Sequence, residues 1–185
     1  MLRSYLLLLG AAALLLTPVI AEEMNLVKLH VDSFSVIGFE TRTSNARESS
    51  GDGPLAKLWV RFRDENYLVQ IPNRVDDRVV AVYSDYESDK DGPYSYLLGA
   101  KVSSTKDIPP GMTSRTVVSG PYAMFTVQGG PPAQILLGLW KHIWSLEKAD
   151  QLHRAYKTDY EVYYDGILTN PNNARVDVYV GLRGK

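Results

Sequence analysis

Apolar and polar positions in residues 26–104 follow two different periods along the chain. Three stretches mix apolar and polar residues as β-strands do, and they are Leu26–Thr43 (one long strand or a bent pair), Arg78–Tyr86 and Tyr94–Ser103. After a polar segment, 45–53, that predicts a loop, apolar residues recur with helical i, i+3, i+4, i+7 spacing at Leu55, Leu58, Trp59 and Phe62. The pattern predicts the order strand, helix, strand, strand.

Residues 113–183 show the same order of patterns. Ser114–Val127 has the composition of a strand region, and Pro132 fits the first turn of a helix. An apolar stripe follows at Ile135, Leu139 and Ile143. Two more strand patterns, Asp159–Asp165 and Arg175–Arg183, end this part, and the segment Ile108-Pro109-Pro110-Gly111 fits a linker between the two parts.

Short sequence matches support this repetition. Residues 58–62 (LWVRF) return as 139–143 (LWKHI), residues 82–85 (VYSD) as 162–165 (VYYD), and Leu98-Gly99 as Val180-Gly181. These offsets of about 80 residues are too long for solenoid repeats, which have periods of roughly 20–50 residues. We therefore predict an α+β fold of two βαββ units, about 26–104 and about 113–183, related by a pseudo-twofold axis. Its antiparallel sheet carries both helices on one face and a central ligand groove.

The first residues have the pattern of a secretory signal peptide. Arg3 precedes an apolar stretch, Leu6–Leu16, and Val19-Ile20-Ala21 offers a cleavage site. We expect residues 1–21 to be a signal peptide, residues 22–185 to form the binding domain, and the protein to be periplasmic or secreted. An uncleaved membrane anchor is the second interpretation, and a membrane is an expected partner only in that case.

Composition narrows the function further. The formal net charge is −1 and no basic block or helix-turn-helix pattern occurs, so we expect no nucleic-acid partner. With no cysteine there is no disulfide or thiolate ligand, and His30, His142 and His153 lack metal-ligand spacing. No known nucleotide or nucleophile motif is present. We expect no metal, no cofactor and no catalytic residues, and favour binding over catalysis.

The strand Asp159–Asp165 contains the strongest candidate for a binding residue. Strand alternation places Tyr160, Val162 and Tyr164 on one face, which we expect to pack under the helices. Glu161 and Tyr163 then face either water or the groove. Their repeat equivalents are Ala81 and Tyr83, so the groove would hold two tyrosines and one carboxylate. Such a site suits an organic cation; the simpler alternative is a solvated glutamate on an exposed sheet face.

Other aromatic residues are weaker candidates for the groove. Trp59 and Trp140 occupy equivalent helix positions, and Tyr96 and Tyr122 begin or flank strands. Each could instead be an ordinary core residue. We expect Asp159 and Asp165, near the strand ends, to be solvated. The predicted ligand-binding set is Glu161, Tyr163, Tyr83, Trp140, Trp59, Tyr122 and Tyr96.

Several of these segments resemble the gyrase-inhibitor-like, or AraC-type effector-binding, domain family. The similar segments are 33–38 (SFSVIG), Leu58-Trp59 with Phe62, 118–125 (VSGPYAMF), the Trp140/Trp144 helix and 159–163 (DYEVY). The resemblance covers Leu26–Arg183 and is strongest to free-standing integron-cassette proteins. It implies the duplicated fold and binding of cationic or amphipathic small molecules, with Glu161 as the charged contact.

Two alternative functions remain open. Some relatives of this fold hydrolyse reactive cytotoxic molecules, and a glutamate beside a tyrosine could act as an acid–base pair. Haem- or tetrapyrrole-binding proteins share a similar duplicated fold, although no histidine lies in a predicted groove strand to serve as axial ligand.

Overall fold

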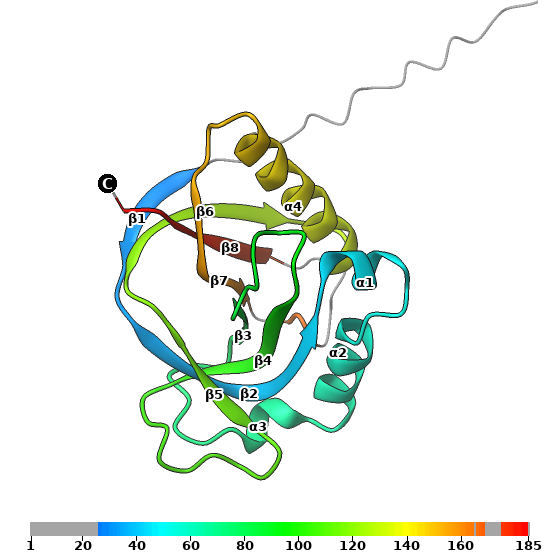
Figure 1. Cartoon of the computed structure of the whole chain (residues 1–185). Helices are drawn as coiled ribbons and strands as arrows, with labels where there is room; N and C mark the ends of the chain where they lie inside the picture. Colours follow the sequence, from blue (N-terminus) through cyan, green and yellow to red (C-terminus); the bar gives the residue numbers. More distant parts are fainter. Residues whose placement is uncertain (1–25, 165, 169–174, 185) are drawn as a thin grey trace, which may run out of the picture.

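The computed structural model describes residues 26–164, 166–168 and 175–184 (Figure 1). Eight strands form one antiparallel sheet in the order β1-β6-β8-β7-β3-β4-β2-β5. The strands are β1 (Val27–Val31), β2 (Phe34–Thr43), β3 (Val79–Ser84), β4 (Tyr94–Val102), β5 (Thr113–Val117), β6 (Gly120–Gln128), β7 (Arg154–Tyr163) and β8 (Arg175–Leu182). The helices are α1 (Asn45–Ser49), α2 (Leu55–Asp64), α3 (Tyr67–Gln70) and α4 (Pro132–Lys148).

The strand order confirms the predicted duplication. Elements β2-α2-β3-β4 and β6-α4-β7-β8 follow one another in the same order, and β3 pairs with β7 at the centre of the sheet. The predicted long strands at the start of each half are bent pairs, β1-β2 and β5-β6. Each half places its first strand beside the other half, since β1 pairs with β6 and β5 pairs with β2. This exchange joins the two halves into one sheet.

The register of the central strand pair locates the pseudo-twofold axis. Ala81 pairs directly with Glu161, its own repeat equivalent, so the axis passes between these two residues. Leu98 lies opposite Ala81, and Val178 lies opposite Glu161. The structural equivalent of Leu98 is therefore Val178, and the sequence match to Val180 is wrong by two residues.

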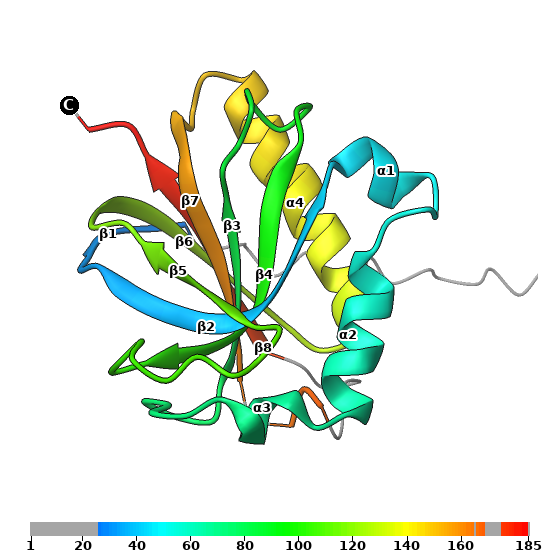
Figure 2. The same cartoon turned by 60° about the horizontal axis from the view of Figure 1, so that its bottom comes forward.

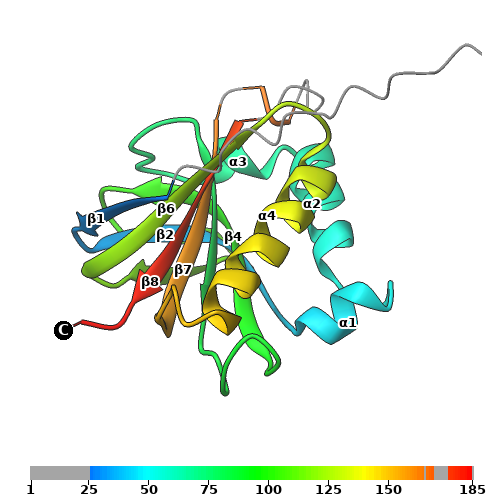
Figure 3. The ribbon, with the colours of Figure 1, turned by 90° about the horizontal axis from the view of Figure 1, so that it is seen from above.

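Helices α2 and α4 both lie on one face of the curved sheet, as predicted (Figures 2 and 3). Phe62, Leu139 and Ile143 of these helices are fully buried in a core that also contains Ala81 and Tyr163. Burial of such side chains contributes about 1.5–3 kcal/mol each. The helices thus cover the face that carries the central tyrosines.

The prediction that Tyr160 and Val162 pack under the helices is wrong. The alternation is correct, but these two residues belong to a second buried cluster that includes Val36 and Val117. Tyr164 packs against the same cluster. Curvature brings the outer strands β2 and β5 over this second face (Figure 1), so both faces are buried and the Glu161 face is the one beneath the helices.

Two short helices were not predicted. Residues 45–49 form α1 where the pattern predicted a loop, and the Ser44 hydroxyl accepts a hydrogen bond from the Arg47 backbone N–H at 3.2 Å as an N-cap.

The predicted signal peptide, residues 1–21, lies outside the described residues. Within the described ranges, no helix has the length and apolar character needed to cross a bilayer.

Candidate ligand-binding site

A pocket of about 700 Å³ lies between the sheet and helices α1, α2 and α4. Six of the seven predicted site residues line it: Trp59, Tyr83, Tyr96, Trp140, Glu161 and Tyr163. The central strands supply the tyrosines and the glutamate, because alternate residues of β3 and β7 point toward the helices. The two helices supply one tryptophan each from equivalent positions.

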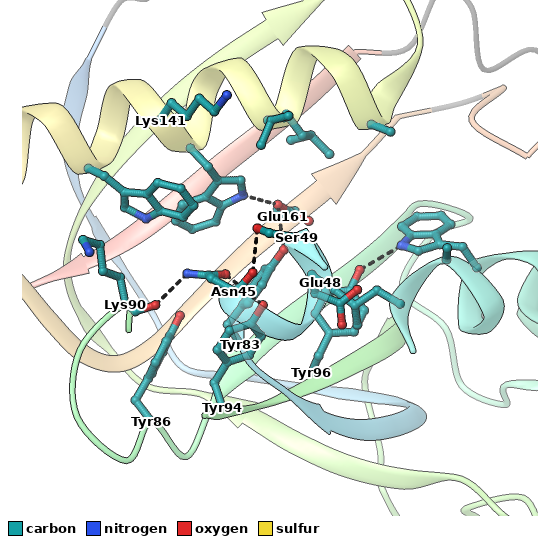
Figure 4. A pocket seen from close by; sticks show the side chains of 18 of the residues that line it. Asn45, Glu48, Ser49, Tyr83, Tyr86, Lys90, Tyr94, Tyr96, Lys141 and Glu161 are labelled. Carbon is teal, nitrogen blue, oxygen red and sulfur yellow. Dashed lines mark hydrogen bonds between the residues drawn. The ribbon is translucent and has the colours of Figure 1, made fainter. Parts of the chain in front are cut away.

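Glu161 lies on the floor of this pocket and is only 1% exposed (Figure 4). Its Oε1 accepts hydrogen bonds from the Trp140 indole N–H at 2.8 Å and the Tyr83 hydroxyl at 3.0 Å. Its Oε2 accepts one from the Tyr163 hydroxyl at 2.6 Å. Tyr83 and its repeat equivalent Tyr163 therefore both donate to one carboxylate on the axis. A solvated glutamate on an exposed sheet face would not have these partners.

Burial dominates the ionisation of this group. Desolvation raises the pKa of Glu161 above its ordinary value, while the hydrogen bonds from Tyr163, Trp140 and Tyr83 partly oppose that rise. Burial, followed by the negative charge of Glu161, raises the pKa of Tyr163 well above its usual value. The Tyr163 hydroxyl therefore keeps its proton and acts as a donor at neutral pH.

The aromatic walls repeat the internal symmetry. Tyr83 packs against Trp140 with ring centroids 5.4 Å apart, and the equivalent Tyr163 packs against Trp59 at 4.7 Å. Each tyrosine thus contacts the tryptophan of the other half. Tyr96 adds an edge-on contact to Tyr83 at 5.0 Å and accepts the Trp59 indole N–H at 2.9 Å. The result is a preformed aromatic surface around one carboxylate.

A second buried charge beside this surface is already neutralised. Arg154 is 2% exposed and donates to Asp159 at 2.5 Å, and the Tyr86 hydroxyl donates to the same carboxylate oxygen at 2.6 Å. The expectation that Asp159 is solvated is wrong, because its exposed fraction is 0%. Strand β7 begins at Arg154, before a bulge, so Asp159 lies inside the strand and not at its end. Asp165 lies outside the described residues. Among the described residues, no salt bridge includes Glu161.

The pocket rim contains charges that the sequence pattern did not reveal. Glu48, from the unpredicted α1, is a second lining carboxylate, so the prediction of a single one is wrong. Lys90 and Lys141 also line the pocket (Figure 4). Lys90 forms an exposed ion pair with Asp91 at 2.6 Å. Lys90 lies in a turn, Glu48 on a short helix and Lys141 on the exposed face of α4. Hydrophobic periodicity does not identify binding residues at such positions.

Tyr122 does not line this pocket, contrary to the prediction. It is 1% exposed within the second cluster, where its hydroxyl donates to the Val118 carbonyl at 2.9 Å and lies 2.7 Å from the Thr158 hydroxyl. Strand alternation in β6 turns it toward the face without helices. None of the three histidines lines the pocket. In the described part of the chain, no group of three or more histidine or acidic side chains could hold a metal ion.

Comparison with known proteins identifies the family. Residues 29–182 match the family described as integron-associated effector binding protein. The Bacillus subtilis (strain 168) protein YobU, named as a candidate transcriptional regulator, is 28% identical over 155 residues, covering 83% of this chain and 95% of YobU.

Solved structures agree with this match. The integron cassette protein VCH_CASS2 from the mobile metagenome of Vibrio cholerae is 26% identical with a TM-score of 0.68, covering 85% of this chain and 95% of that one. SAV2435, solved bound to tetraphenylphosphonium, is 18% identical with a TM-score of 0.69 over 87% of this chain and 95% of its own, and so shares the fold. This chain therefore belongs to the integron-associated effector-binding family of small-molecule-binding proteins, which confirms the predicted resemblance.

Proposed function

We propose that this protein binds a hydrophobic organic cation in the central pocket, with Glu161 as the counter-charge and no chemical conversion of the ligand. The observation that carries the proposal is the state of the Glu161 carboxylate. It is 1% exposed, accepts hydrogen bonds from three neutral donors, and has no salt-bridge partner among the described residues.

An unpaired buried carboxylate costs free energy in the ligand-free protein. A cation placed over the surrounding rings offsets that cost, because attraction between charges is strong where water is excluded. The rings of Tyr83 and Trp59 add cation–π attraction of roughly 0.5–2 kcal/mol. The three hydrogen-bond donors can stay in place, because the cation attracts the carboxylate across the aromatic rings and does not have to contact it directly.

The other charges around the pocket do not cancel this preference. Asp159 pairs with Arg154, and Asp91 pairs with Lys90. Lys141 is exposed on α4, where water and salt screen its charge. The structure of SAV2435 with tetraphenylphosphonium supports the same ligand class at the level of fold, because that ion is a large apolar cation.

Two ions of similar shape and opposite charge test the proposal. Calorimetric titration with tetraphenylphosphonium and tetraphenylborate separates the contribution of charge from that of apolar burial. In Glu161→Gln we expect the cation to lose about 10- to 150-fold in affinity, the scale of a charge-assisted contact. The anion should bind the variant no more weakly than the wild type.

Glu48→Gln is the matched control, because it removes a carboxylate from the partly exposed rim of the same pocket. It should weaken the cation by less than Glu161→Gln does, since solvent screens the rim. Equal losses for both ions in Glu161→Gln, or no loss for either, would show that Glu161 does not select the ligand by charge.

We also propose that residues 1–21 direct the chain out of the cytoplasm and are removed after Ala21. The support is the pattern of Arg3, the apolar stretch 6–16 and the small residue at position 21. Fractionation of the native host and N-terminal sequencing of the recovered protein provide the test. A mature chain that begins at Glu22 is expected, and an intact Met1 on cytoplasmic protein would contradict the proposal.

A further inference from the structure

A second cavity of about 440 Å³ adjoins the central pocket. The two cavities share five lining residues: Ala56 and Trp59 of α2, Ala133 and Leu136 of α4, and Tyr163 of β7. The cavities therefore meet between α2 and α4, next to the ring of Tyr163. Alanine at both Ala56 and Ala133 leaves space at this junction that larger side chains would fill.

The second cavity differs from the first in chemistry. Its remaining lining residues are Val60, Arg63, Pro132, Ile167 and Leu168, of which only Arg63 is charged. Arg63 is half exposed and forms an ion pair with Asp64 at 2.8 Å, so its guanidinium group lies at the solvent-exposed end of the cavity. The second cavity thus offers an apolar lining and no carboxylate, whereas the first provides Glu161.

We infer that the two cavities form one groove for an elongated amphiphile, an inference that rests on the proposed function and specifies its ligand class. The cationic head lies over Glu161 in the first cavity, and an alkyl tail passes Trp59 into the second. Along α4, Trp140 in the first cavity and Pro132 in the second are eight residues apart, which corresponds to about 12 Å. A compact cation cannot fill both spaces.

The hydrogen bonds around Glu161 favour a head without N–H donors. Three donors, from Trp140, Tyr83 and Tyr163, already point at the carboxylate. A primary ammonium would have to displace them or leave its own N–H groups unpaired, which costs free energy. A quaternary ammonium makes no such demand, and its apolar surface suits the aromatic walls.

Alkyltrimethylammonium ions from butyl to dodecyl, each kept below the concentration at which it forms micelles, provide the test. In the wild type we expect affinity to rise about fourfold for each added methylene while the tail enters the second cavity. Val60→Trp should fill that cavity from a position on α2 that is 48% exposed, where a larger side chain is tolerated. This variant should keep the butyl affinity and lose the gain from longer tails.

Two further variants make the result decisive. Leu168→Trp narrows the same cavity from a different segment and should act as Val60→Trp does. Val69→Trp is the matched control, because Val69 is a 59% exposed valine that lines neither cavity. It should change no affinity in the series.

The inference is overturned if wild-type affinity stops rising at the shortest tails, or if Val60→Trp weakens butyl and dodecyl ions equally. Melting temperatures of all variants confirm that each is folded. Failure of the proposed function gives a different result: Glu161→Gln would then leave even the butyl ion unaffected. Selectivity for charge and dependence on tail length are thus measured separately.

Discussion

The two halves of this molecule share one architecture and differ at the residues that meet on their axis. Ala81 and Glu161 are repeat equivalents and direct ladder partners, yet one is a methyl group and the other a carboxylate. The tryptophans diverge in the same way. Trp140 donates to Glu161, whereas Trp59 donates to the neutral hydroxyl of Tyr96.

This difference shows how a duplicated fold obtains an asymmetric site. A perfectly symmetric axis would carry two carboxylates opposite each other, which could not both be ionised at such short separation. Tyr96 has Val176 as its equivalent, since these two residues pair with Tyr83 and Tyr163 respectively. At the axis, half one therefore supplies neutral aromatic residues, and half two supplies the buried carboxylate.

Restoring the symmetry should have the largest effect. Ala81→Glu places a second carboxylate across the ladder from Glu161, at a position that is 0% exposed. An uncompensated buried charge costs roughly 3–5 kcal/mol, so the free energy of unfolding at neutral pH should fall by about that amount. Urea denaturation measures it, and part of the loss should be recovered at low pH where one carboxyl is protonated.

Ala81→Gln separates charge from volume, because glutamine has nearly the same size as glutamate without its charge. Overpacking alone typically costs about 1–3 kcal/mol. The charge interpretation predicts that Ala81→Gln is clearly more stable than Ala81→Glu. Equal destabilisation by the two substitutions would mean that only the space on the axis matters.

The tryptophan pair gives an intermediate effect. Trp140→Phe removes a donor to a buried carboxylate and should lower the free energy of unfolding at neutral pH by roughly 1.5–3 kcal/mol. Trp59→Phe removes a donor to a neutral hydroxyl and should cost only about 0.5–1.5 kcal/mol. Both variants lose the same indole group from equivalent helix positions, so each controls for the other. Equal losses would contradict the functional difference between the halves.

Much of this arrangement could be predicted from the sequence. The repeat near 80 residues predicted the order of strands and helices in each half, and period-two alternation placed Glu161 with Tyr163 and Tyr83. Alternation fixes which residues share a face, but it does not tell which face the helices cover. Tyr160 and Val162 were therefore assigned to the wrong face, and the curved sheet buries them in the second cluster instead.

The missed site residues have a common physical reason. Glu48 lies on the short helix α1, and Arg154 precedes the bulge in β7, where alternation is interrupted between Arg154 and Asp159. Neither position belongs to a long periodic element. The burial of Asp159 depends on that irregular part of β7 and on Tyr86 from the other half, and hydrophobic periodicity reveals neither.

The smallest expected effect is the pH dependence contributed by Glu161. Burial raises its folded-state pKa above the ordinary value of 4.5, so the folded protein holds this proton more tightly than the unfolded chain does. The resulting stability is fully present below the unfolded-state pKa and is lost as the pH rises through the folded-state pKa. Each unit of the rise corresponds to about 1.4 kcal/mol.

Comparing the wild type with Glu161→Gln isolates this group, because all other titrating residues are common to both proteins. The free energy of unfolding of the wild type, minus that of the variant, should fall as the pH rises from about 4, where the carboxyl begins to ionise in the unfolded chain.

Affinity for tetraphenylphosphonium should increase over the pH range in which the Glu161 carboxyl of the folded protein ionises. Trp140→Phe should move that range to higher pH, since it removes a hydrogen bond that favours the carboxylate, while Trp59→Phe should not. If this pH range moved equally in both variants, the two tryptophans would affect the Glu161 carboxylate equally, which would contradict the difference between the halves.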